Sequence, residues 1–364
     1  MRPGEVQRWR LLDAAAGETL VVVLQGHSLN IIANDGITVP HMRTLRAGVP
    51  YVMGAGQRVD LLVKAGQPGI YLLQAIDPTP SDAPGWPVVS GSDLDPAPRQ
   101  ARLSGDLPTP TYPITLATIV VAGMPIDMPL PAGPLPAPQS LPSIDTMLNA
   151  PLNAARHVAF ENCGERAGMQ APTMRLPSCG WYFDRYDADY WGGTAFTTLL
   201  MMRDADDRGE PNPNPDPQEP LVNFQKEALF TEDQSLFTDM VARNLEEWTV
   251  VNRSFSDHAF HIHQNPFLVT HVNGKPLSPP EWHDTILVPA AQPQGGDINQ
   301  ATFGSITFRI NYDPVTIGDF VMHCHMLTHE DIGMMQRLSI VSQEASGPKP
   351  PTSRRTARHA GSRP

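Results

Sequence analysis

The sequence predicts an all-β protein built from two domains. Its 364 residues exceed the usual size of one domain and would fill two domains of ordinary size. The 39 prolines and 28 glycines are too dense for long helices, because proline removes a backbone donor and clashes with the preceding helical turn. Short apolar or alternating runs with turn residues between them indicate sandwiches or barrels instead.

The first part of the chain contains a series of such runs. Residues 6–11 and 20–24 read as strands, and Asp13 and Gly17 form the turn-prone segment between them. Each later run is bounded by glycine or proline or is rich in β-branched residues. Further strands are expected at residues 58–63, 71–74 and 114–121.

A proline-rich stretch separates the two predicted domains. Seven prolines fall between residues 124 and 142, enough to hold the backbone in extended polyproline geometry and to prevent a packed sheet. We therefore expect a first domain at residues 1–135, a linker at 136–150 and a second domain at 151–345.

The second domain shows its own strand series, interrupted by a long insertion at residues 163–220. The repeated prolines of residues 211–217 place a surface loop inside this insertion. Strands are expected at residues 157–160, 247–251, 267–272, 285–288, 305–310 and 320–322.

Charge and hydropathy exclude several classes of protein. The formal net charge is -12, and the polar, proline-rich tail at residues 346–364 is basic, so the body is strongly acidic and unsuited to a nucleic-acid surface. The tail has nothing to bury and is expected to be disordered. No run reaches the roughly 18 apolar residues of a membrane span, and no signal peptide is visible at the N-terminus.

Six of the 12 histidines fall in two short windows, residues 258–263 and 323–334. Side chains alternate along a strand, so His323 and His325 would project to one side and Cys324 to the other, and one tripeptide could serve two metal centres. On the cysteine side, a thiolate, two imidazoles and an axial thioether make the ligand set of a blue copper site. The expected ligands are His258, from a neighbouring loop, Cys324, His329 and Met334, with Met335 as the less favoured axial candidate.

The two windows resemble the third and fourth copper-binding segments of multicopper oxidases, the family of laccases, bilirubin oxidases and cuprous oxidases. Residues 3–11 and 54–63 resemble the middle domain of three-domain members, and residues 282–289 resemble the strand before the last copper segment. The resemblance implies that both domains are cupredoxin-like Greek-key β-barrels.

Carried over by position, the resemblance implies copper at three kinds of centre. The type 1 ligands are those named above, His261 matches a type 2 ligand, and the type 3 ligands are His263, His323 and His325. A complete trinuclear cluster takes eight histidines in the family, and four come from two His-x-His segments of the first domain. This sequence has only the two His-x-His segments just named. We therefore expect a chain whose type 2 and type 3 ligands are half present, as in a truncated product or one half of a split enzyme.

The implied function is laccase-like. A small reducing substrate would give single electrons to the type 1 copper through His329, Cys324 would pass them on to the cluster, and dioxygen would be reduced to water, with a separate first domain as a partner. The alternative is a mononuclear blue-copper electron-transfer or copper-binding protein without oxidase turnover. A non-catalytic remnant that folds poorly is a third reading.

Three lesser features also follow from the resemblance. Glu330 matches an acid that assists proton delivery in bacterial spore-coat laccases, although an exposed carboxylate or a ligand-orienting acceptor are the simpler readings. The family suggests a periplasmic or extracellular location. A disulfide between Cys163 and Cys179 would suit that location, and two unbridged thiols remain the alternative.

Overall fold

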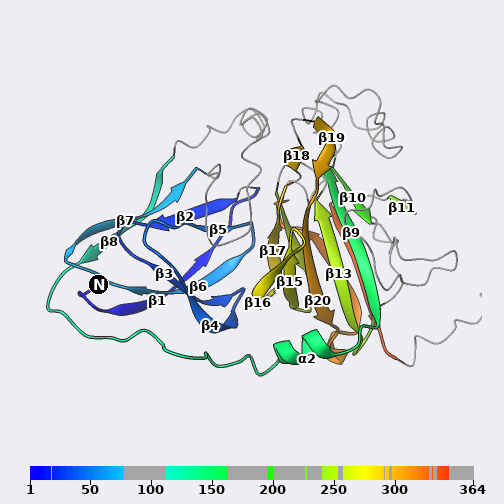
Figure 1. Cartoon of the computed structure of the whole chain (residues 1–364), viewed down its shortest axis with the longest axis horizontal. Coiled ribbons are helices and arrows are strands. Elements are labelled where there is room, and N and C mark those ends of the chain that lie inside the picture. The colour runs from blue at the N-terminus through cyan, green and yellow to red at the C-terminus, as the bar shows by residue number, and fades with distance from the viewer. Residues whose placement is uncertain are drawn as a thin grey trace, which may run out of the picture.

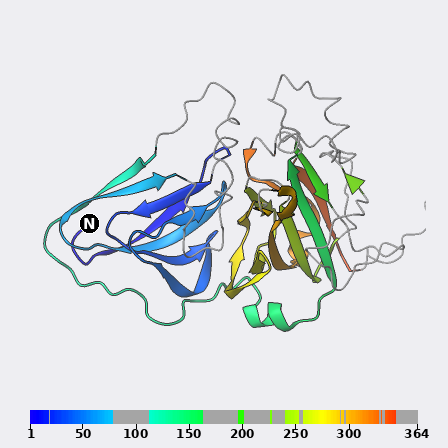
Figure 2. The ribbon, with the colours of Figure 1, turned by 45° about the horizontal axis from the view of Figure 1, so that its top comes forward.

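The structure is a computed structural model whose described residues form two β-sandwiches lying side by side (Figures 1 and 2). The predicted all-β class is confirmed. Among the described residues, no helix has the length and apolar character needed to cross a membrane. The description covers residues 1–17, 19–77, 112–162, 196–200, 226–227, 240–252, 257–290, 292–294, 297–327, 330 and 334–343.

The N-terminal sandwich packs two four-stranded sheets face to face, in the orders β1-β6-β3-β4 and β5-β2-β7-β8. Alternate side chains of both sheets, including Val22, Ile31 and Leu61, are fully buried between them. All five runs expected in this half coincide with strands. The strands are β1 (Val6–Leu12), β2 (Leu20–Leu24), β3 (Leu29–Asn34), β4 (Ile37–Leu45), β5 (Tyr51–Met53), β6 (Arg58–Lys64), β7 (Gly69–Ile76) and β8 (Ile114–Val121).

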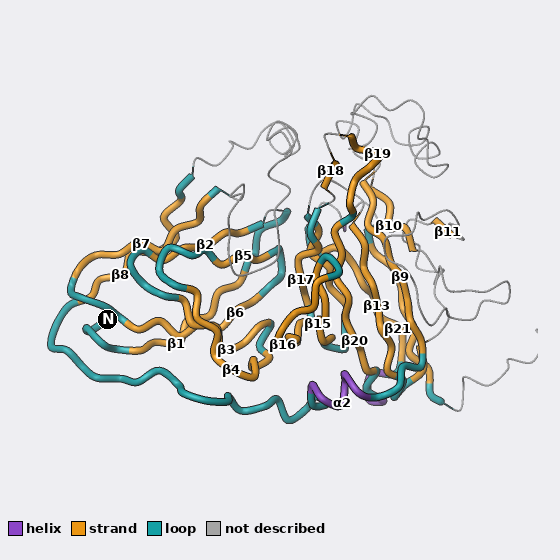
Figure 3. Tube along the Cα trace, in the orientation of Figure 1, coloured by secondary structure: helices purple, strands orange, loops and turns teal. Residues whose placement is uncertain are grey.

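An extended segment leads from β8 to the helix α2 (Ile144–Asn149) along one side of both sandwiches (Figure 3). Ser143 caps this helix by accepting a hydrogen bond from the Thr146 amide at 3.0 Å. At the other end, Arg309 of the C-terminal sandwich donates to the Met147 and Leu148 carbonyls at 2.9 and 2.7 Å. The helix therefore fixes the incoming chain against the C-terminal sandwich.

The C-terminal sandwich holds a seven-stranded sheet, β11-β10-β9-β13-β20-β15-β16, against a five-stranded sheet, β12-β22-β21-β14-β17, with a small β18-β19 ribbon beside them. Its core is aromatic: the rings of Phe267 and Phe308 lie 4.4 Å apart, and Trp248 stacks on Phe308 at 5.9 Å. Each such buried side chain stabilises the fold by about 1.5–3 kcal/mol. The six runs expected here all lie within strands.

The strands of this half are β9 (Ala154–Asn162), β10 (Phe196–Leu200), β11 (Lys226–Glu227), β12 (Met240–Val241), β13 (Leu245–Asn252), β14 (His258–Ile262), β15 (Phe267–Val272), β16 (Lys275–His283), β17 (Thr285–Val288), β18 (Gln292–Gln294), β19 (Asp297–Thr302), β20 (Gly304–Asn311), β21 (Gly318–Cys324) and β22 (Met335–Val341). A 3-10 turn, η1 (Pro314–Thr316), precedes β21.

Candidate metal centre

The two histidine-rich windows meet because β14 pairs with β21 in the middle of the five-stranded sheet. In the antiparallel register, Phe260 lies opposite Cys324 and His261 lies opposite His323. Because side chains alternate along each strand, this register puts two donor sets on opposite faces of the sheet. His258, which the sequence predicts in a loop, is the first residue of β14.

On the core side of the sheet, a thiol, an imidazole and a thioether are buried together. His258, Cys324 and Met334 each have no exposed surface, and the Cys324 Sγ lies 3.6 Å from the His258 Nδ1. The Cys324 amide donates to the Met334 carbonyl at 3.0 Å, which fixes the two residues beside each other. Met335 is partly exposed and begins β22, opposite His323. His329 lies outside the described residues.

On the other face, four imidazoles from the two strands and the residues just after them gather. One ring nitrogen each of His261, His263 and His323 lies within 4.8 Å of the other two. The His263 and His323 Nε2 atoms are 3.2 Å apart, and the His325 ring lies 5.3 Å from the rings of both His261 and His323. The structure therefore brings together all four residues that the resemblance assigns to the type 2 and type 3 centres.

Backbone carbonyls determine which ring nitrogen of two imidazoles carries the proton. The His261 Nδ1 lies 2.7 Å from the Asp284 carbonyl, and the His323 Nδ1 lies 3.1 Å from the Cys324 carbonyl. A carbonyl oxygen only accepts, so each Nδ1 donates and each Nε2 keeps its lone pair. Two Nε2 lone pairs are thereby left available to a metal ion.

Burial keeps the imidazoles neutral and the thiol protonated. Desolvation lowers the pKa of His261 and of His323 to about 4, and it lowers the pKa of His263 as well. The three imidazoles are therefore neutral at pH 7, as ligands must be. Burial raises the pKa of the Cys324 thiol to about 12, so a bound metal ion would be needed to remove its proton.

The N-terminal sandwich reaches the imidazole cluster through the loop between β5 and β6. Gly56 lies directly under His325, since a Cβ built on it would come within 2.5 Å of the His325 ring. Its φ of +80° also favours glycine. Beside it, Val52 packs against Ala259 and Leu287 of the C-terminal sandwich. The loop thus covers one flank of the cluster.

Glu330 stands next to the same cluster. Its carboxylate lies 3.4 Å from the His323 Nδ1, and its side chain is 27% exposed. In this position the Glu330 carboxylate contacts His323, a candidate ligand, and remains accessible to water.

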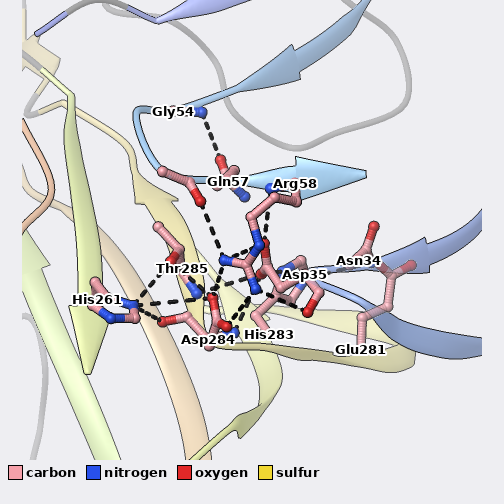
Figure 4. Close-up of polar contacts among 11 residues, drawn as sticks. Asn34, Asp35, Gly54, Gln57, Arg58, His261, Glu281, His283, Asp284 and Thr285 are labelled. Carbon is pink, nitrogen blue, oxygen red and sulfur yellow. Dashed lines mark hydrogen bonds and ion pairs between the residues drawn. The ribbon is translucent and has the colours of Figure 1, made fainter. Parts of the chain in front are cut away.

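Sequence reasoning missed the residues that surround His261. Asp35, Arg58, Asp284 and Thr285 form a polar cluster at the junction of the two sandwiches (Figure 4). Arg58 and Asp284 lie inside segments 54–63 and 282–289, which carried part of the family resemblance, but no feature of either segment alone shows that they meet.

The donor set fits copper. A buried thiol with imidazole and thioether neighbours suits a blue copper site, and a group of neutral imidazoles suits further copper ions. Cys163, Cys179, the basic tail and most of the insertion at residues 163–220 lie outside the described residues.

Comparison with known proteins agrees with this arrangement. Sequence models of two domains, each described as multicopper oxidase, match residues 1–85 and 204–344. Among solved structures, a multicopper oxidase from Campylobacter jejuni, described as a metallo-oxidase, is similar with a TM-score of 0.56 and 18% identity; the match covers 92% of this chain and 53% of that one.

Two other solved structures show the same fold. A laccase-like multicopper oxidase from Ochrobactrum sp. matches with a TM-score of 0.55 and 18% identity over 93% of this chain and 56% of its own. A laccase from Pediococcus acidilactici matches with a TM-score of 0.55 and 18% identity over 92% of this chain and 50% of its own. These likenesses support the cupredoxin-like character of both sandwiches. The chain spans about half the length of the structures that it matches.

Proposed function

Because this chain belongs to the multicopper oxidase family, we propose that it is the copper-binding part of a laccase-like oxidoreductase. The enzyme would couple one-electron oxidation of a small reducing substrate to the reduction of dioxygen to water. The observation that carries the proposal is the position of Cys324 between two donor sets. Its thiol lies beside His258 and Met334, and the adjacent His323 belongs to the imidazole cluster on the opposite face.

The residues of each set have distinct roles in this proposal. His258, Cys324, Met334 and, by resemblance, His329 hold the type 1 copper, and the four clustered imidazoles contribute to the type 2 and type 3 centres. Copper bound at these centres supplies the one-electron redox chemistry. The apolar core around Cys324 keeps water away from the thiolate. The peptide that joins Cys324 to His323 and His325 gives a short covalent connection between the two sets.

We propose two roles for Glu330: it influences the His323 ring, and it delivers protons to the cluster. Its carboxylate lies 3.4 Å from the His323 Nδ1, close enough to act on the ring through its charge while the Nδ1 proton is donated to the Cys324 carbonyl. Reduction of dioxygen to water consumes protons, and a partly exposed carboxylate beside the cluster can carry them from solvent.

A second candidate function is mononuclear electron transfer without oxidase turnover. The three described type 1 residues all come from the C-terminal sandwich, so that site can form within one fold. The imidazole cluster contains four of the eight histidines that the resemblance requires. Copper content measured with a first-domain partner present separates the two functions, because only the oxidase would then hold further copper ions at the cluster.

Replacement of the cysteine tests the type 1 assignment. Cys324→Ser should abolish the intense blue absorption of copper-loaded protein while the circular dichroism stays unchanged, because a hydroxyl is a poor substitute for the soft sulfur donor. The matched control is the double variant Cys163→Ser/Cys179→Ser, which should stay blue. A blue Cys324→Ser protein would refute the assignment.

We also propose an exported location, periplasmic or extracellular, as the family suggests. An oxidising compartment would allow the Cys163–Cys179 disulfide. Thiol labelling of protein isolated from its native host without reductant tests this proposal. Complete labelling of both cysteines would argue against the bridge.

A further inference from the structure

An ion pair between the two sandwiches lies next to the imidazole cluster. The Arg58 guanidinium of β6 donates to both carboxylate oxygens of Asp284, with distances of 2.7 Å to Oδ1 and 2.6 Å to Oδ2 (Figure 4). A two-point contact of this kind fixes the orientation as well as the position of a carboxylate. The two residues are 226 positions apart in the chain.

A second N-terminal residue holds the backbone around Asp284. The Asp35 Oδ2 accepts from the amides of Asp284 and Thr285 at 3.2 and 3.3 Å, and it lies 3.1 Å from the His283 Nδ1. The Asp35 side chain has no exposed surface. Asp35 itself is fixed by Arg58, whose amide donates to its Oδ1 at 3.0 Å and whose Nη2 donates to its carbonyl at 2.9 Å.

The segment fixed in this way is the one that contacts His261. The Asp284 carbonyl accepts from the His261 Nδ1 at 2.7 Å. The Thr285 hydroxyl lies 2.9 Å from the same Nδ1 and donates to the Asp284 Oδ1 at 2.9 Å. The orientation of the His261 ring therefore depends on a segment whose position is set by the other sandwich.

The same guanidinium also supports the loop under His325. The Arg58 Nη1 donates to the Gly56 carbonyl at 3.2 Å, and Gly56 lies against the His325 ring. Arg58 thus contacts both Asp284, which binds His261, and Gly56, which packs against His325.

We propose that Asp35 and Arg58 are positioning residues for the imidazole cluster, although neither is a metal ligand. They act through Asp284 and Thr285, which hold the His261 Nδ1–H and so present the Nε2 lone pair to the metal. This inference rests on the proposed function, because it assigns copper to the cluster. It adds that the N-terminal sandwich, which supplies none of the assigned ligands, determines the affinity of that cluster.

A comparison of two interface arginines tests the proposal. Arg43 also joins the sandwiches, through Glu281 at 3.1 Å, and Glu281 approaches Asp35 by way of His283 instead of through the Arg58–Asp284 ion pair. Arg58→Met, Arg58→Lys and the control Arg43→Met would each be made in the full chain. In metal-free protein, ¹⁵N spectra of the imidazoles report the tautomer of His261. Titration with Cu(II) against a competing chelator, after the type 1 site is filled, reports the affinity of the cluster.

We expect Arg58→Met to mix the His261 tautomers and to weaken Cu(II) binding at the cluster by about 10–100-fold, the usual effect of losing a group that orients a ligand. Arg58→Lys, which keeps the charge and one donor, should recover part of the affinity. Arg43→Met should match the wild type, and all variants should keep the same blue band. Unchanged His261 spectra in both Arg58 variants, or equal loss of affinity in Arg43→Met, would overturn the proposal.

The two readouts separate this inference from the proposed function. If wild-type protein binds no copper at the cluster, the oxidase assignment fails, and the ¹⁵N spectra of the metal-free variants still decide whether Arg58 positions His261.

Discussion

At the scale of single residues, Cys324 and the adjacent His323 lie in two different environments. The Cys324 side chain enters the apolar core, and His323 faces the imidazole cluster beside Glu330. Alternation along β21 is the physical cause, because successive side chains leave a strand on opposite faces. One strand therefore carries residues of two donor sets, one in the apolar core and one in the imidazole cluster.

The axial ligand can be tested by a volume-conserving change. Met334→Leu should keep the blue colour and raise the reduction potential, because loss of a thioether donor destabilises Cu(II) relative to Cu(I). Redox titration of the blue band measures the shift. Met335→Leu is the control, since Met335 is partly exposed in β22. A shift in Met335→Leu alone would move the axial role to that residue.

His283 should make stability depend on pH. Burial lowers its pKa, but contacts with the Asp35 and Glu281 carboxylates outweigh burial and raise the pKa to about 9. In the unfolded chain the value is about 6.5. The resulting stabilisation is fully present below about pH 6.5 and is lost as the pH rises through about 9. Its upper bound is about 3 kcal/mol from the size of the shift.

Denaturant unfolding of metal-free protein at pH 6.5 and pH 9 measures this dependence, with His283→Gln as the reference variant. Arg43 and Arg58 also contact the two carboxylates, Arg43 through Glu281 and Arg58 through Asp35. The assignment would be wrong if His283→Gln lost stability between the two pH values as steeply as the wild type.

At the scale of elements, the loop between β5 and β6 joins the two sandwiches most closely. Gly54 and Gly56 both lie where a Cβ would collide with the C-terminal sandwich, at Leu287 and at His325. The loop also carries Ala55, which is buried within the core cluster of the C-terminal sandwich. Small residues are required because the two backbones approach each other here.

Gly56→Ala should therefore disturb the imidazole cluster. Left-handed backbone strain costs about 1 kcal/mol, and the collision with His325 adds to it. Gly48→Ala is a matched control, because Gly48 has a similar φ of +85° and open space around it. We expect equal backbone strain in both variants and weaker Cu(II) binding at the cluster only in Gly56→Ala, measured by chelator competition. Equal affinity in the two variants would contradict the contact.

Half of the described strands were not expected from the sequence, and for two of these strands the physical reason is clear. β4 contains Pro40, and β16 contains Pro276, Pro279 and Pro280, residues that argue against a central strand. Both lie at the edge of their sheets, where a missing amide donor leaves no partner unpaired. Whether a strand lies at an edge depends on the assembled sheet, so the local sequence pattern cannot predict it. The domain limits at residues 135, 151 and 345 stay a prediction.

At the scale of the whole molecule, the two sandwiches meet at a mixed apolar and charged interface beside the cluster. Protein made from these 364 residues should retain close to one tightly bound copper per chain and should show little or no oxygen-coupled oxidation of phenols. The reason is the number of ligands: four imidazoles leave the remaining copper ions open to water and weakly held.

Copper analysis after mild chelation, with an oxygen electrode alongside, measures both quantities. The expected centre reduces and reoxidises with one electron. Three or four retained copper ions with oxygen consumption would mean that other histidines supply ligands, with His27, His41 and His157 as the first to examine by substitution.

The sequence by itself determined the all-β class, half of the described strands and the two candidate donor sets. Those features depend on patterns within short windows: the alternation around Cys324 and the spacing from His258 to His263. Only the tertiary structure decided that the windows pair through β14 and β21, and that Asp35 and Arg58 reach Asp284 across the junction. Contacts between residues more than 200 positions apart depend on how whole sheets pack, so no local pattern of side chains specifies them.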